Sequence, residues 1–152
     1  MNTKNNKCFM QKIIFCSFLF VLLAVSQAPV FAQTTVNVML QEWRMMSDKS
    51  RIPAGKVKFS VQNRGQETHE IVLLKTNLAY DSIPLQSSGG IDENNAGVLI
   101  DELEDISSKT GKSMTVMLKP GNYVLLCNMV EMEQGQKEEH YAMGMRVPLI
   151  VE

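Results

Sequence analysis

The chain has 152 residues, of which 45% are hydrophobic and 20% are charged, and its formal net charge is −1. This length suits one domain with a single hydrophobic core and does not suit two. The near-balanced charge excludes the strongly basic class of nucleic-acid-binding proteins, so we expect no nucleic-acid partner.

The first 32 residues have the pattern of a secretory signal peptide. Three lysines precede an apolar run over 13–25, and the small residue Ala32 suits a cleavage site. An uncleaved membrane anchor is the alternative, but the run is shorter than the roughly 20 residues that span a bilayer. We therefore expect residues 1–32 to be removed and residues 33–152 to form the domain. The product would be exported to a periplasm or the cell exterior, without stable membrane insertion.

Apolar and polar residues alternate through much of this domain, which is typical of half-buried strands. Turn residues, such as the Pro-Gly pair after Lys119, separate most of the alternating segments. The pattern predicts an all-β fold, an antiparallel β-sandwich or barrel. The six predicted strands are 35–43, 56–63, 69–75, 112–119, 122–128 and 146–152.

A long middle region, 76–111, separates the third and fourth of these strands and is too long for a plain loop. Within it, residues 98–106 place Val98, Leu103 and Ile106 at about helical spacing, which predicts a short helix. The region is either a crossover between sheets, which we favour, or a cap that forms a partner surface.

Four side chains are candidate metal ligands: His69, Cys127, His140 and Met145. The two histidines and the cysteine are the only ones in residues 33–152, and each lies beside an expected strand boundary. Taken singly, the histidines could be surface residues, and the cysteine and methionine could fill the core. Because strand ends of a Greek-key sandwich gather at two poles, all four could also meet at one pole.

The chemistry of this set favours copper. A thiolate with two imidazoles and a weak axial thioether is the ligand set of a blue-copper electron-transfer site. Structural zinc usually takes four Cys or His ligands, and calcium and magnesium prefer oxygen. The sequence therefore predicts one copper ion that alternates between Cu(I) and Cu(II).

Three segments carry a resemblance to a known family: "NRGQETHEIVLL" (63–74), "LKPGNYVLLCN" (118–128) and "HYAMGM" (140–145). With them the whole domain resembles the cupredoxins, the small blue-copper proteins. The resemblance implies a Greek-key β-sandwich with a short helix or long loop in its middle region. It also implies that His69, Cys127 and His140 are equatorial ligands, that Met145 is axial, and that electrons pass through His140 as the more exposed imidazole.

The chain departs from the family pattern at two places. Twelve residues separate Cys127 from His140, which is an insertion in the ligand loop, and Glu70 replaces the asparagine that follows the first histidine in many members. The acidic residues of the insertion either steer a positively charged partner or form a solvated turn. Nearby methionines either guide Cu(I) to the site or belong to the core and rim; they are Met129, Met132 and Met143.

From these observations we expect an exported mononuclear type 1 copper protein that transfers single electrons between redox partners. A partner would be a redox protein such as a cytochrome or a membrane oxidase, and we expect the protein itself to be a monomer. The alternative is a periplasmic copper carrier that hands the ion to another protein, and a metal-free binding module also remains open. An enzyme is not expected, because one ligand set and one domain leave no second reaction centre.

Overall fold

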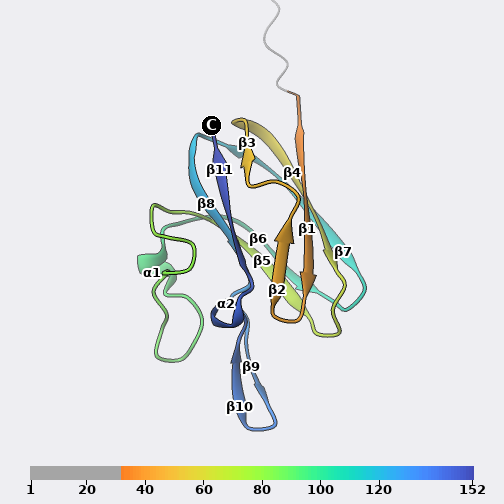
Figure 1. The fold of residues 1–152 in the computed structure, drawn as a ribbon, viewed down its shortest axis with the longest axis vertical. Coiled ribbons are helices and arrows are strands. Elements are labelled where there is room, and N and C mark those ends of the chain that lie inside the picture. Colours follow the sequence, from red (N-terminus) through yellow and green to blue (C-terminus); the bar gives the residue numbers. More distant parts are fainter. Residues whose placement is uncertain (1–31) are drawn as a thin grey trace, which may run out of the picture.

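The computed structural model describes residues 32–152, so the predicted signal peptide, 1–32, lies outside the described residues except for its last residue. Two β-sheets face each other and a two-stranded hairpin projects from one end (Figure 1). No helix within residues 32–152 is long and apolar enough to cross a membrane. The elements are β1 (Thr34–Gln41), β2 (Arg44–Ser47), β3 (Arg51–Ile52), β4 (Gly55–Asn63), β5 (His69–Lys75), α1 (Glu93–Ala96), β6 (Val98–Ile106), β7 (Gly111–Leu118), β8 (Gly121–Leu126), β9 (Val130–Glu133), β10 (Gln136–Glu139), α2 (His140–Met143) and β11 (Arg146–Val151).

The first sheet has the strand order β2-β1-β4-β7, in which β1 runs parallel to β4. Its strands follow the predicted alternation, because every second side chain of β1 and β4 is buried. These inward side chains form one half of the main core, and the fully buried Phe59 is the largest of them. Burial of such side chains against the second sheet is the main source of stability in a sandwich.

The second sheet has the order β3-β11-β8-β5-β6 and determines which strand ends meet. Strand β8 lies antiparallel to both β5 and β11, with Leu126 opposite Val72 on one side and Arg146 on the other. The end of β8 therefore lies beside the start of β5 and the start of β11. His69, Cys127 and Met145 occupy these three strand ends.

All six predicted strands are present, but the helix predicted over 98–106 is wrong. Residues Val98–Ile106 form β6, an edge strand that pairs antiparallel with β5. Two register shifts interrupt this pairing, between His69 and Ile71 and between Leu73 and Leu74. Such bulges break the alternation of inward and outward side chains, which is why the apolar residues imitate helical spacing.

The rest of the middle region packs on the outer face of the second sheet. Residues 76–97 contain the one-turn helix α1, which Asp92 caps, and a bridge between Leu85 and Ile91. They complete a second apolar cluster that includes Val72, Leu74, Ile83, Ile91, Ala96, Val124, Leu126 and Tyr141. Residues 76–97 therefore form a packed covering segment between two strands of the same sheet, and after them the chain crosses to the other sheet only between β6 and β7.

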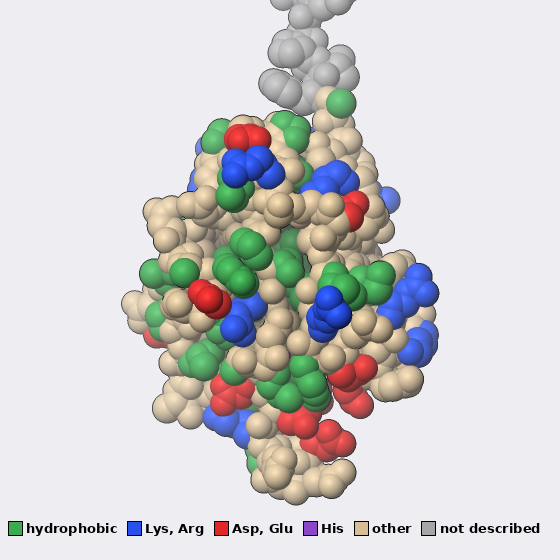
Figure 2. Space-filling view, in the orientation of Figure 1, with side chains coloured by type: hydrophobic (Ala, Val, Ile, Leu, Met, Phe, Trp, Pro, Cys, Tyr) green, Lys and Arg blue, Asp and Glu red, His purple; other side chains and the backbone are tan. Residues whose placement is uncertain are grey.

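The insertion between Cys127 and His140 forms the antiparallel hairpin β9–β10, which projects beyond the body of the sandwich (Figure 1). Its side chains are mainly exposed; Met132, for example, is 68% exposed. Acidic side chains gather at the same end of the molecule (Figure 2).

Candidate metal centre

The structure brings together three of the four predicted ligands through their donor atoms. Nδ1 of His69 lies 3.3 Å from Nδ1 of His140, which in turn lies 3.3 Å from Sγ of Cys127. All three donor atoms lie within 4.8 Å of one another. Ligand–metal distances of about 2.0–2.3 Å would hold neighbouring imidazole and thiolate donors roughly 3.3–3.8 Å apart. The spacing therefore fits a single metal ion bound between them.

The fourth predicted ligand, Met145, belongs to the same buried cluster as Cys127 and is itself 0% exposed. Its backbone connects the other ligands, because its N–H donates to the carbonyl of His140 and its carbonyl accepts from the N–H of Cys127, each at 3.0 Å. A thioether at this point adds a soft donor to the thiolate and imidazoles. The set of two nitrogens and two sulfurs fits copper better than the oxygen-seeking divalent ions.

The ligand side chains are closed off from water. His69, Cys127 and His140 are each 0% exposed, and neither histidine is visible on the face in Figure 2. Nε2 of each imidazole is buried without a hydrogen-bond partner among residues 32–152. The prediction that His140 is the more exposed imidazole is therefore wrong, because both rings are equally covered.

The β1–β2 turn provides much of this cover. The half-buried Trp43 packs edge-on against His140, with ring centroids 5.0 Å apart and an interplanar angle of 71°. A Cβ at Gly144 would lie 3.0 Å from the Trp43 carbonyl, and Gly144 has φ of 123°, so glycine suits this close approach. The other residue of the turn, Glu42, places Oε1 3.7 Å from Nε2 of His69.

Glu70 links the two segments that carry His69 and Cys127. Its backbone N–H donates to Cys127 Sγ at 3.5 Å, and its side-chain Oε1 accepts from the N–H of Asn128 at 2.9 Å. Burial raises the pKa of Glu70, although the Asn128 N–H opposes this effect. The residue that departs from the family pattern thus bonds to both ligand segments.

Without a metal the site favours its uncharged form. Burial raises the pKa of Cys127 to about 12 and lowers the pKa of His69. Burial, together with the nearby His69, lowers the pKa of His140 to about 4. A bound cation would replace the thiol proton with its own charge, so binding releases a proton and is opposed by acid.

Two polar networks fix the ligand loops. Buried Asn63 shapes the turn before His69, because its amide donates to the carbonyls of Glu67 and Ile106, and its Oδ1 accepts from the N–H of Gly65. Tyr141, which follows His140, accepts from the N–H of Ile83 and donates to the carbonyl of Tyr80 at 3.0 Å each.

Asn128, which follows Cys127, is also tied to residues 76–97. Its Oδ1 accepts from the N–H of Ile91, and its side-chain amide donates to the Glu93 carboxylate at 3.3 Å. The covering segment therefore holds the residue next to one ligand on each side of the insertion.

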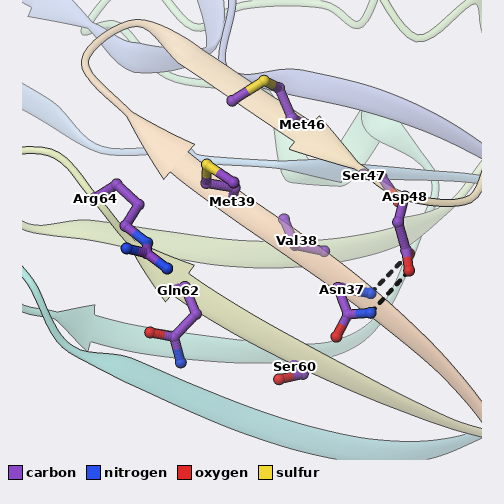
Figure 3. Close-up of a pocket in the computed structure, with 9 residues that line it drawn as sticks. All are labelled: Asn37, Val38, Met39, Met46, Ser47, Asp48, Ser60, Gln62 and Arg64. Carbon is purple, nitrogen blue, oxygen red and sulfur yellow. Dashed lines mark hydrogen bonds between the residues drawn. The ribbon is translucent and has the colours of Figure 1, made fainter.

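The other features singled out in the sequence do not belong to the cluster of donor atoms. Met129 is partly buried against the main core, whereas Met132 and Met143 are 68% and 41% exposed. A groove of about 410 Å³ lies over the outer face of β1, β2 and β4 (Figure 3). Its lining includes Met39, Met46 and Gln62 but none of the predicted ligands.

Sequence reasoning missed Glu42 and the covering role of Trp43. Trp43 is partly buried and packs at the rim of the main core. The only sequence signal was the position of both residues at the end of an alternating strand. That signal does not reveal which distant loop the turn meets.

No protein-family model and no curated protein sequence matches the chain. Several solved structures are similar to it. Reduced auracyanin from Roseiflexus castenholzii is 22% identical, with a TM-score of 0.52 that covers 78% of this chain and 97% of auracyanin. Rusticyanin from Thiobacillus ferrooxidans is 17% identical, with a TM-score of 0.53 that covers 79% of this chain and 77% of rusticyanin.

A reduced rusticyanin structure is 18% identical, with a TM-score of 0.54 over 79% of each chain. At these identities the likeness concerns the backbone fold. The two facing sheets, the short helices and the shared strand arrangement confirm the predicted all-β sandwich. The chain has the cupredoxin fold.

Proposed function

We propose that the protein is an exported mononuclear type 1 copper protein that transfers single electrons between redox partners. The observation that carries this proposal is the convergence of two imidazole nitrogens and one thiol sulfur in a site closed to water. His69 and His140 would bind through Nδ1, Cys127 through Sγ, and Met145 through its thioether. Copper held there supplies a single-electron couple between Cu(I) and Cu(II).

The protein's own groups would keep the site nearly unchanged during that exchange. His69 and Met145 are placed by strand ends of one sheet, and backbone hydrogen bonds join the ligand segments. The N–H of Glu70 points at the sulfur and would stabilise negative charge on it. Small rearrangement of the ligands favours rapid electron transfer.

Electrons would enter or leave across Trp43, which contacts the ring of His140. The Trp43 ring is partly exposed, whereas His140 is 0% exposed. A partner protein such as a cytochrome or membrane oxidase would dock at this end of the sandwich. The acidic side chains of the β9–β10 hairpin project from the same end and would attract a positively charged partner; they are Glu131, Glu133, Glu138 and Glu139.

A copper carrier is the second candidate function. Donors that are 0% exposed disfavour it, because a carrier must release its ion to a partner's ligands. Two exposed methionines, Met132 in β9, which follows Cys127, and Met143 in α2, which begins at His140, are the feature that would favour it. The two functions differ in how fast bound copper exchanges.

The test is a copper titration of residues 33–152, followed by visible spectroscopy, voltammetry and exchange with a Cu(I) chelator. We expect an intense visible band from thiolate-to-copper charge transfer, a reversible couple and slow exchange. Cys127→Ser should remove the band, whereas Met117→Ser, on the exposed outer side of β7, should leave it intact. A colourless complex that loses copper rapidly would support the carrier, and equally tight binding by Cys127→Ser would refute the ligand assignment.

Export is part of the proposal and is supported by the signal-peptide pattern of residues 1–32. Expression of the full chain with a mass measurement of the recovered protein would test it. A mature protein that begins near Gln33 is expected, and an intact N-terminus would contradict cleavage.

A further inference from the structure

Glu42 faces a buried atom that the proposed function leaves without a role. Its Oε1 lies 3.7 Å from Nε2 of His69, the imidazole nitrogen opposite to the one that faces the other ligands. The His69 side chain is 0% exposed, and Nε2 has no hydrogen-bond partner among the described residues. Within residues 32–152, Glu42 is the carboxylate that comes within 4.0 Å of this nitrogen.

The carboxylate is held in place by groups outside the metal centre. Oε1 accepts hydrogen bonds from the backbone N–H groups of Gln66 and Glu67, the latter at 2.9 Å. Gly65 makes room for it, because a Cβ at that position would lie 2.0 Å from Oε1. The Glu42 side chain is 32% exposed, so most of it is packed against this turn. The β1–β2 turn and the turn before His69 therefore meet through Glu42.

A metal bound at Nδ1 gives Nε2 a definite chemical state. With Nδ1 occupied, the neutral imidazole carries its proton on Nε2, and a buried N–H needs an acceptor. The present 3.7 Å separation is longer than a hydrogen bond. A small rotation of the ring would close it to the roughly 2.9 Å of an N–H···O contact.

We propose that Glu42 positions His69 and donates negative charge through it to the metal, forming a carboxylate–histidine–copper relay. This inference rests on the proposed function. Because the extra negative charge stabilises Cu(II) more than Cu(I), Glu42 holds the reduction potential below the value that the four ligands alone would give. It also fixes which nitrogen of His69 binds the metal.

Glu42→Gln removes the negative charge of Glu42 and should preserve the fold. The glutamine oxygen still accepts from Gln66 and Glu67, so the turn is preserved. We expect the ratio of Cu(II) to Cu(I) affinity to fall about tenfold, which for one electron raises the reduction potential by about 59 mV. Glu42→Asp retains the charge and should restore most of the wild-type potential.

Glu67→Gln is the matched control, because it removes one exposed negative charge from the same turn. It should change the affinity ratio by less than a third of the Glu42→Gln effect. Titration with Cu(II), and with Cu(I) in competition with a chelator, measures the two affinities, and voltammetry measures the reduction potential. Thermal unfolding of the metal-free variants checks that they fold. A Glu42→Gln potential equal to that of Glu67→Gln would overturn the inference. So would an equal loss of affinity for both oxidation states, which would indicate a purely structural role.

These outcomes separate the inference from the proposed function. A wild-type protein with a reversible couple that Glu42→Gln does not shift refutes the relay alone. Copper binding without a reversible couple refutes electron transfer, and the Cu(II) titrations of the two variants still decide the relay. A wild-type protein that binds no copper refutes both.

Discussion

Two hairpins flank the candidate metal centre, and they contribute to it very differently. The β1–β2 turn touches both imidazoles through Glu42 and Trp43, although it is far from either histidine in sequence. The β9–β10 hairpin begins next to Cys127 and ends at His140, yet most of its side chains point into solvent. Proximity in sequence to a ligand is thus a poor guide to which residues surround it. The next four experiments would break or sharpen this contrast.

Truncation of Trp43 should have the largest effect. Removing a buried aromatic side chain costs about 3–5 kcal/mol, and the half-buried Trp43 should cost about 3 kcal/mol. Trp43→Ala should also admit water to His140 and speed the loss of bound copper. Urea unfolding and chelator exchange measure these effects, and Trp43→Phe should recover part of both. An unchanged free energy of unfolding and an unchanged rate of copper loss would mean that the β1–β2 turn does not shield the site from water.

Acid should destabilise the metal-free protein by a similar amount. Folding holds the pKa of His140 at about 4, so between pH 4 and 6.5 the unfolded chain binds a proton at this residue and the folded protein does not. The stability is complete above the unfolded value near 6.5 and is lost as pH falls towards 4. The loss is at most about 3 kcal/mol, at 1.36 kcal/mol per pKa unit.

Urea midpoints between pH 5 and 7.5 would measure this dependence in a range where most carboxylates stay ionised. The lowered pKa of His69 acts in the same direction. His140→Gln should flatten the curve, and bound copper should do the same by occupying the ring nitrogen. A wild-type curve that is flat from pH 5 to 6.5 would contradict a buried neutral imidazole.

Loss of the Tyr141 hydroxyl should have a smaller effect. Tyr141→Phe leaves the Ile83 N–H and the Tyr80 carbonyl without this partner, at a cost of about 1–2 kcal/mol. Thermal unfolding would measure it, with Tyr80→Phe as the control because the Tyr80 side chain is 40% exposed. Equal effects of the two variants would show that residues 76–97 do not anchor the ligand loop.

Neutralising the β9–β10 hairpin should have the smallest effect on the protein itself. Replacement of Glu131, Glu133 and Glu138 by glutamine should change stability by less than about 0.5 kcal/mol and leave the visible band unchanged. Association with a positively charged redox protein should slow at low salt and become salt-independent. The control removes three charges from β6, at Asp101, Glu102 and Glu104. A shifted visible absorption band would mean that the β9–β10 hairpin does contact the surroundings of the metal centre.

Strands with strict alternation could be predicted from the sequence, and so could the clustering of the candidate ligands. The four side chains stood out because histidine and cysteine are scarce in residues 33–152 and lie at strand ends. Antiparallel pairing of β8 with both neighbours then brings those ends together. Local pattern was sufficient where side-chain direction follows position along a strand.

Prediction failed where a contact depends on distant parts of the chain. Strand β6 was mistaken for a helix because its bulged pairing with β5 disturbs the period of two. The predicted exposure of His140 was wrong, and Trp43, from the distant β1–β2 turn, packs against its ring. Glu42 was missed because its partners Gln66, Glu67 and His69 lie on a turn of a different strand.

The seclusion of Cys127 has a consequence for the protein before it receives its metal. Oxidants and disulfides react with an accessible thiolate, whereas this sulfur is 0% exposed and its pKa is raised to about 12. The metal-free protein should therefore resist sulfenic acid formation and disulfide-linked dimerisation. In an oxidising compartment, Cys127 would stay reduced and able to bind copper.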